Sequence, residues 1–166
     1  MTERHDVSAF NRLSSDEAKG LLRTCLDVPR WVDEVEGGRP YAGWPALRLA
    51  AEQAAASLTD AELHAALSRH PRIGERAGAG HDVEHSEREQ SDVDPEDLDT
   101  ASRLAAGNAA YEQRFERVFL IRAAGRSTDE ILAELDRRLE NDDMTERGET
   151  VEQLSEIAVL RLESAV

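Results

Sequence analysis

Apolar residues follow a helical spacing along most of the chain. Leu, Ala, Val and Ile recur every three or four residues, which places them on one face of an α-helix. These helical patterns cover residues 14–26, 43–58, 59–70, 94–119, 127–141 and 145–166. The most strand-like piece, VFLIRAAG at 118–125, is too short to make a sheet. The pattern therefore predicts an all-α bundle of about seven to nine helices, and the length fits a single domain over 1–166.

Cap residues mark where several of these helices begin. The S/T-x-x-E spacing of a capping box opens three segments, at Ser14, Thr59 and Ser127. Asp94 followed by Pro95 is a further start signal, because proline fits the first position of a helix.

Two segments interrupt the helical pattern. Residues 29–45 hold three prolines and three glycines, so we expect a short helix with loops there. Residues 74–97 combine glycines with a dense run of acids. A loop this long in a compact domain is usually functional or disordered. On composition alone, a solvated acidic face is the alternative.

Charge and cysteine content narrow the class of protein. The net charge of −15 and the pI of about 4.7 argue against binding to nucleic acid or to anionic lipid, although local arginines could still hold a small anion. Cys25 is the only cysteine, which excludes an intramolecular disulfide and fits a reducing compartment. We expect it to be a small buried apolar residue. No stretch approaches the roughly 18 apolar residues of a membrane span, and MTERHDVSAF lacks a signal core, so we expect a cytoplasmic protein.

The first candidate for chemistry is His70, in SRHPRIG. Pro71 restricts the backbone of the residue before it and so fixes the direction in which the histidine leaves the helix. A helix C-terminus also stabilises a charged imidazole ring, which suits acid–base chemistry near neutral pH. The alternative is that His70 only caps helix carbonyls.

A second candidate is SEREQ, residues 86–90. If this piece is helical, Ser86, Glu89 and Gln90 share one face. A hydroxyl, a carboxylate and an amide together could hold a small molecule rich in amide or ureido groups. The alternative is a solvated start of a helix.

Arg161 is the anomaly of the last helical segment. It shares a face with Leu154 and Ile157, so the arginine must extend to solvent, pair with an acid, or line a cavity and hold an anion. In GNAAYEQRFERVFLI, the side chains of Asn108, Tyr111, Phe115 and Phe119 would lie within one arc if the helix continued that far. Most of that arc should be core, and Phe119 could form a pocket wall.

The HDVEH run at 81–85 matches a zinc signature, H-x-x-E-H. That signature needs a buried helix and a further ligand downstream. Here glycines precede the run and acids follow it, so we expect no metal site.

Taken together, these pieces resemble the OHCU decarboxylases (2-oxo-4-hydroxy-4-carboxy-5-ureidoimidazoline decarboxylases). The pieces that carry the resemblance occur in order over nearly the whole chain: WVDEVEGGRPYAG, HPRIG, SEREQ, NAAYEQRF with VFLIRAAGRS, EILAELDRRLEND and EIAVLRL. Each piece is a weak signal, whereas their order and spacing together are a strong one. The resemblance implies an all-helical fold and an enzyme that needs no cofactor.

The resemblance also implies roles for individual residues. The catalytic residues would be His70, its partner carboxylate Glu89, and Arg161, which would hold the anion. The substrate contacts would be Pro71, Ser86, Glu87, Arg88, Gln90, Phe119, Leu120, Ile121, Arg122 and Ala123. The chain departs from many members at Arg72-Ile73, where they have Asp-Leu, and at 116–118, where they have Gly-aromatic-Pro.

The expected activity is a carboxy-lyase reaction in urate and purine degradation, giving (S)-allantoin and CO2 from a ureide. A homodimer is compatible with this expectation. Two alternatives stay open: a non-enzymatic acidic helical module that binds a partner protein, and a decarboxylase or hydrolase of a related ureide. The acidic module would not explain why His-Pro, S-x-x-E-Q and Arg161 occur in one chain.

Overall fold

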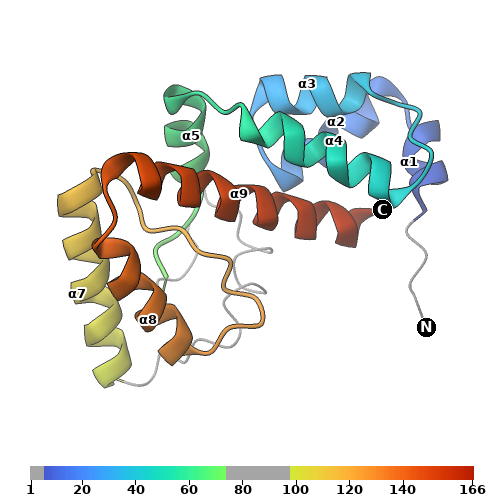
Figure 1. Cartoon of the computed structure of the whole chain (residues 1–166). Coiled ribbons are helices and arrows are strands. Elements are labelled where there is room, and N and C mark those ends of the chain that lie inside the picture. Colours follow the sequence, from blue (N-terminus) through green and yellow to red (C-terminus); the bar gives the residue numbers. More distant parts are fainter. Residues whose placement is uncertain (1–5, 74–97) are drawn as a thin grey trace. The chain divides into compact units, whose positions relative to one another are not determined.

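The computed structural model describes residues 6–73 and 98–166 (Figure 1). Within these ranges the chain forms eight α-helices and no strand, which confirms the all-α prediction. The helices are α1 (Val7–Arg12), α2 (Ser15–Cys25), α3 (Pro29–Gly37), α4 (Trp44–Ala56), α5 (Asp60–Leu67), α7 (Leu98–Phe115), α8 (Thr128–Leu139) and α9 (Asp143–Ala165).

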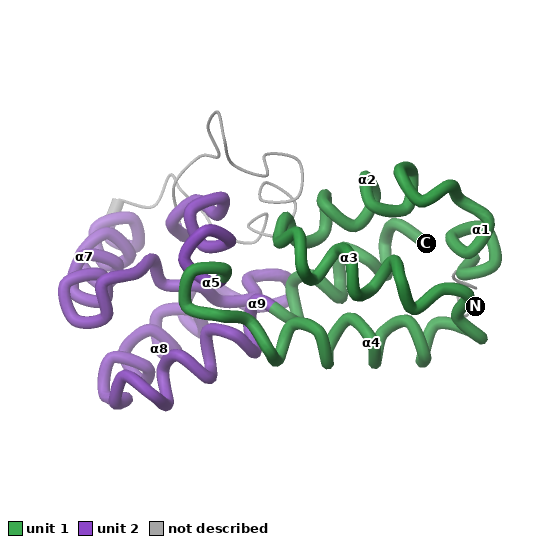
Figure 2. Tube along the Cα trace, turned by 90° about the horizontal axis from the view of Figure 1, so that it is seen from above, with its two compact units in different colours: residues 1–62, 155–166 green, residues 63–154 purple. Residues whose placement is uncertain are grey.

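The chain divides into two compact units (Figure 2). Unit 1 holds the residues up to Glu62 together with Ser155–Val166, and unit 2 holds Leu63–Leu154. Helix α9 contributes its first half to unit 2 and its second half to unit 1. The single-domain assignment for 1–166 therefore stays a prediction.

The predicted capping boxes are confirmed. Ser14 and Ser127 each accept a hydrogen bond from the backbone N–H of the glutamate three residues on, and that glutamate accepts one in return. Thr59 makes the same reciprocal pair. Helix α3 is the short helix expected within 29–45. The start signal at Asp94 lies outside the described residues.

In unit 1, helix α3 packs against α2 and α4, and Trp31 of α3 is fully buried. The Trp31 indole N–H donates to the Ala51 carbonyl at 3.0 Å, so the polar edge of this large ring is satisfied inside the core. The hydrophobic pattern missed α1, a helix of six residues whose start is capped by the Asp6 side chain. Such a helix is too short to show the repeat that identified the others.

Unit 2 is built around the contact between α7 and α8 (Figure 1). Its core includes Tyr111 of α7 and Ile131 and Leu135 of α8. Gly107 lets the two helices approach closely, because a Cβ added there would lie 2.3 Å from Leu135 Cδ2. Within this unit, residues 118–123 run between α7 and α8 without helix or strand.

The helical pattern predicted for 94–119 ends earlier than expected, at Phe115. Glu116 has a φ of 57°, in the left-handed region, and this conformation cannot continue a right-handed helix. Its N–H still bonds to the Glu112 carbonyl at 2.9 Å. Phe119 is therefore not on the α7 face with Asn108 and Tyr111, although its ring still reaches Tyr111, with 5.1 Å between the centroids.

Candidate active site

His70 lies in a turn that follows α5, three residues beyond the last helical residue. The backbone N–H groups of Arg69 and His70 bond to carbonyls three residues back, at 3.2 and 3.1 Å, so the chain tightens before Pro71. The helix thus stops at Leu67 and not at His70 as the pattern predicted. His70 is only 8% exposed. The His70 side chain is therefore buried, although Ser68 and Arg72 on either side of it are exposed. The direction of its ring stays a prediction.

The residues after His70 are fastened to α7. The Arg72 guanidinium forms a salt bridge with Glu112, in which Nη2 donates to Oε2 at 3.0 Å. Asn108 Nδ2 donates to the Ile73 carbonyl at 3.2 Å, and this contact is buried. These two contacts give Arg72-Ile73, where the chain departs from many family members, a role in fixing the His-Pro turn to α7.

The predicted substrate segment 119–123 is mostly buried. Phe119, Leu120, Ile121 and Ala123 are each at most 4% exposed, and only Arg122 is half-buried. A segment without helix or strand must find other partners for its backbone N–H and C=O groups. Two side chains from outside the segment provide such partners here.

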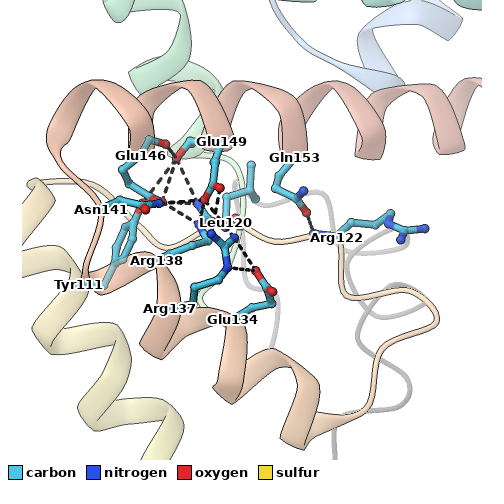
Figure 3. A network of polar contacts seen from close by, with 11 residues as sticks. Tyr111, Leu120, Arg122, Glu134, Arg137, Arg138, Asn141, Glu146, Glu149 and Gln153 are labelled. Carbon is cyan, nitrogen blue, oxygen red and sulfur yellow. Dashed lines mark hydrogen bonds and ion pairs between the residues drawn. The ribbon is translucent and has the colours of Figure 1, made fainter.

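The first of these side chains is Arg138 of α8, which is 1% exposed (Figure 3). Its Nη1 donates to the Leu120 carbonyl at 2.6 Å. Its Nε donates to Glu146 Oε1 at 2.8 Å, and Nη2 donates to the same oxygen. The guanidinium carbon also lies 4.6 Å from the centroid of the Phe119 ring, a cation–π contact. One guanidinium therefore ties a buried carboxylate of α9 to two residues of the segment.

Glu146 is fully buried and accepts from further donors. The Tyr111 hydroxyl donates to its Oε1, and Asn141 Nδ2 donates to its Oε2 at 3.0 Å. Burial, and then the hydrogen bond to Glu146, raise the pKa of Tyr111 above its usual value. The hydroxyl of Thr150 lies against the same group, 3.3 Å from Arg138 Nη2. We call Tyr111, Arg138, Glu146 and Thr150 the buried ion network.

The second side chain is Gln153, also on α9. Its Oε1 accepts from the Arg122 backbone N–H at 2.9 Å, while the Arg122 side chain points away (Figure 3).

Sequence reasoning placed Tyr111 in the core but assigned no role to Arg138, Glu146 or Thr150, although a signal was present. Arg138 follows Ile131 and Leu135 at helical spacing, so a charge falls on the apolar stripe of α8. Glu146 and Thr150 precede Leu154 in the same way on α9. This is the argument that singled out Arg161, and it applies equally to EILAELDRRLEND.

Arg161 lies on α9 within unit 1 and is 3% exposed, so its guanidinium does not extend to solvent. Its Nη1 is 3.5 Å from the Cys25 carbonyl, at the outer limit of a hydrogen bond. Burial raises the pKa of the Cys25 thiol to about 11, although the Arg161 charge opposes the shift. Cys25 itself is 2% exposed, which confirms the prediction of a buried residue.

The predicted site residues fall into three groups: those in unit 2, Arg161 in unit 1, and those outside the described ranges. Ser86, Glu87, Arg88, Glu89, Gln90 and the HDVEH run lie outside the described residues. His70 and 119–123 belong to unit 2 and Arg161 to unit 1, so their convergence on one pocket stays a prediction.

In the part of the chain that the structure describes, no cluster of three or more His, Cys, Asp or Glu could hold a metal ion. Within the same ranges, no helix is both long and apolar enough to cross a membrane.

A model of the OHCU decarboxylase family matches residues 11–163. The chain belongs to this family. The match covers the His-Pro turn, the SEREQ run, the 119–123 segment and Arg161 together.

Two curated relatives of the chain carry the name of this family. The chain is 30% identical over 165 residues to a 2-oxo-4-hydroxy-4-carboxy-5-ureidoimidazoline decarboxylase of Amia calva, covering 97% of this chain and 94% of that protein. It is 28% identical over 162 residues to the protein of the same name from Haloferax volcanii, covering 94% and 93%. It is also 25% identical to the "uric acid degradation bifunctional protein" of Bacillus sp. (strain TB-90), covering 95% of this chain but only 31% of that longer protein.

Solved structures share the fold. An OHCU decarboxylase crystallised in the presence of (S)-allantoin aligns with a TM-score of 0.70 at 20% identity, covering 86% of this chain and 94% of that one. An (S)-allantoin synthase aligns with a TM-score of 0.71 at 16% identity, covering 96% and 54%. At these sequence identities, the structural similarity supports a shared fold and nothing more specific.

Proposed function

We propose that this protein is a carboxy-lyase that converts 2-oxo-4-hydroxy-4-carboxy-5-ureidoimidazoline to (S)-allantoin and CO2 in urate degradation. The observation that carries the proposal is the family match across residues 11–163. Two relatives that bear the decarboxylase name align over nearly their full length, which supports the same activity for the whole of this chain.

The reaction sets three requirements for the site. When the C–CO2 bond breaks, its electron pair stays on the ring as an enolate-like anion. The enzyme must hold the substrate carboxylate, stabilise that anion, and deliver a proton to one face of the ring. Neighbouring ring nitrogens and carbonyls can accept the electron pair, so we propose that no cofactor is needed.

The predicted residues can be given roles in these steps. Arg161 would hold the anion through paired hydrogen bonds. Ser86 and Gln90 would orient the ring and the ureido group. His70 would donate the proton, and Glu89 beside it would favour the charged imidazolium or take the substrate hydroxyl proton. The contacts from 119–123 and from Pro71, Glu87 and Arg88 would complete the site.

The His-Pro turn supports this assignment for His70. A residue that only capped helix carbonyls would need neither a buried side chain nor the two contacts that fasten the residues after it to α7. The hydrogen bond from Asn108 and the salt bridge to Glu112 fix the residues directly after Pro71. Such fixation is what a proton donor that acts on one face of a substrate requires.

To test the proposal, the ureidoimidazoline is generated in situ from urate, and the optical activity of the allantoin formed is followed. We expect the protein to accelerate its formation and to give an excess of the (S) enantiomer. Racemic allantoin at the spontaneous rate would refute the proposed function. Turnover of a different ureide alone would favour the related-ureide alternative.

Variants of the predicted acid–base pair make the test specific. His70→Asn should lower kcat/KM at least ~100-fold, as removal of a positioned general acid does. Glu89→Gln should cost a similar factor, and the double variant scarcely more, because coupled residues are not additive. His64→Asn, an exposed histidine on α5, is the matched control. If His70→Asn loses stability but keeps near-normal turnover, His70 only caps helix carbonyls and is not the proton donor.

The remaining expectations stay predictions. We propose a small-molecule ureide as the only ligand class, with no nucleic acid or membrane partner. The homodimer can be checked by light scattering and the cytoplasmic location by cell fractionation.

A further inference from the structure

The backbone of the predicted substrate segment is held at two points, one on each side of Ile121. Arg138 Nη1 donates to the Leu120 carbonyl at 2.6 Å, and the Arg122 N–H donates to Gln153 Oε1 at 2.9 Å (Figure 3). These residues come from two different helices, α8 and α9, yet both act on main-chain atoms of the same three residues. We call these two hydrogen bonds the backbone clamp.

The Arg138 side of the clamp is itself rigid. Arg138 is 1% exposed, and its guanidinium bonds to the fully buried Glu146 and makes a cation–π contact with the Phe119 ring. A planar fork of donors can serve a carboxylate and a carbonyl at once, whereas a lysine ammonium on a flexible stem cannot reproduce both directions. Glu146 in turn is fixed by the Tyr111 hydroxyl and by Asn141. The Leu120 carbonyl is therefore held by a side chain with little freedom to move.

We propose that Arg138 and Gln153 are positioning residues for the decarboxylation, because they fix the main chain of 120–122 where substrate is to be bound. This inference rests on the proposed function, which places 119–123 against the substrate. The segment has no helix or strand to define its path, so two side-chain contacts define it instead. A displacement of about 1 Å in a substrate-positioning group can cost on the order of 100-fold in rate.

The neighbouring Arg137 differs from Arg138 in the groups that it contacts. It pairs with Glu134 and Glu149 on the exposed side of α8, at 2.7 and 3.0 Å. The hydrogen bonds of Arg137 found among the described residues go to Glu134 and Glu149, and none of them reaches the 119–123 segment. Arg138 and Arg137 are thus adjacent in sequence, with the same chemistry and different targets.

Gln153→Met is the main test, because it removes the acceptor at nearly constant volume in a half-buried position. We expect kcat/KM to fall about tenfold or more, with a lower excess of (S)-allantoin and a melting temperature close to wild type. Gln153→Glu keeps an oxygen acceptor for the Arg122 N–H and should restore the rate to within about threefold of wild type. Gln113→Met, on the exposed face of α7, is the control for the glutamine-to-methionine change. Wild-type rate and wild-type enantiomeric excess in Gln153→Met would overturn the proposal.

Arg138→Lys tests the other side of the clamp, with Arg137→Lys as its control. Arg138→Lys keeps the positive charge beside Glu146 but loses the fork, so we expect a drop in kcat of about tenfold or more among folded molecules. Arg137→Lys should stay within about twofold of wild type. Equal rates for the two lysine variants would overturn the role of Arg138.

Amide hydrogen exchange separates this inference from the proposed function. The Arg122 amide should be protected in the wild-type protein and should exchange at least about tenfold faster in Gln153→Met, because its acceptor is lost. This measurement needs no substrate. If the wild-type protein forms no (S)-allantoin, the proposed function fails while the clamp can still be detected. If the Arg122 amide exchanges equally fast in both proteins, the clamp itself is refuted.

Discussion

Replacing Glu146 by glutamine removes the one negative charge at the centre of the buried ion network. Glu146 is fully buried, and its two oxygens accept hydrogen bonds from Arg138, Tyr111 and Asn141. A glutamine has nearly the same shape but only one acceptor oxygen. Whichever way the amide turns, its NH2 group meets a donor on one side. The Arg138 charge also loses its close partner.

The expected cost follows from burial. Removing one member of a buried ion pair typically costs about 3–5 kcal/mol, because a charge is left without compensation. Glu149 Oε2 is 3.6 Å from Arg138 Nε and 28% exposed, so it compensates in part. We therefore expect the lower end of the range, about 3 kcal/mol. At about 2–4 °C per kcal/mol for a chain of this size, the melting temperature should fall by roughly 6–12 °C.

The assay is urea and thermal unfolding of Glu146→Gln, followed by far-UV circular dichroism at fixed pH. Glu152→Gln is the matched control, since Glu152 is an exposed glutamate on the same helix. That control should stay within about 0.5 kcal/mol of wild type. If Glu146→Gln also unfolds within that margin, the buried network contributes little to stability and the reasoning from burial is wrong.

Three further predictions concern single side chains. Arg161→Ala should raise KM and lower kcat, by about 10- to 150-fold in kcat/KM for the loss of a charged partner worth ~1.5–3 kcal/mol; early melting with full activity would instead indicate a structural pair. Burial raises the Cys25 pKa to about 11 from 9.0, so the unfolded chain loses this proton first as pH rises. The free energy of unfolding should therefore fall between pH 9 and 11 by at most about 3 kcal/mol, measured by urea titrations over a pH series. Cys25→Ala lacks the thiol and should show a smaller fall. An equally steep fall in Cys25→Ala would refute the prediction. Glu116→Gly should raise the melting temperature by about 2–4 °C, because glycine adopts the left-handed conformation without the ~1 kcal/mol cost of a side chain; a lower melting temperature would contradict this.

The sequence by itself determined which residues form most of the helices. The capping boxes at Ser14, Thr59 and Ser127 were readable because both partners lie within one turn. The apolar repeat was readable for the same reason, since it needs only the helical period. The family could also be identified from sequence, because its motifs are short and their order survives when most other positions differ.

Helix ends were less accessible to sequence reasoning. The apolar repeat ran on to 119 and to 70, but the helices stop at Phe115 and Leu67. Glu116 is a residue that ordinarily continues a helix, and nothing local predicts its positive φ. Beyond Phe115 the chain brings Phe119 into the core of unit 2 against Tyr111, a contact that no local sequence signal predicts.

Only the tertiary structure decided the partners of the charged residues on apolar stripes. The sequence placed Arg161 on such a stripe, and the same reasoning would have placed Arg138, but it could not say what either contacts. Arg138 meets Leu120, 18 positions away, and Gln153 meets Arg122, 31 positions away. Such contacts depend on how α8 and α9 pack around a segment without regular structure. Side-chain periodicity fixes only the face on which a residue lies, whereas the partner across that face is fixed by packing.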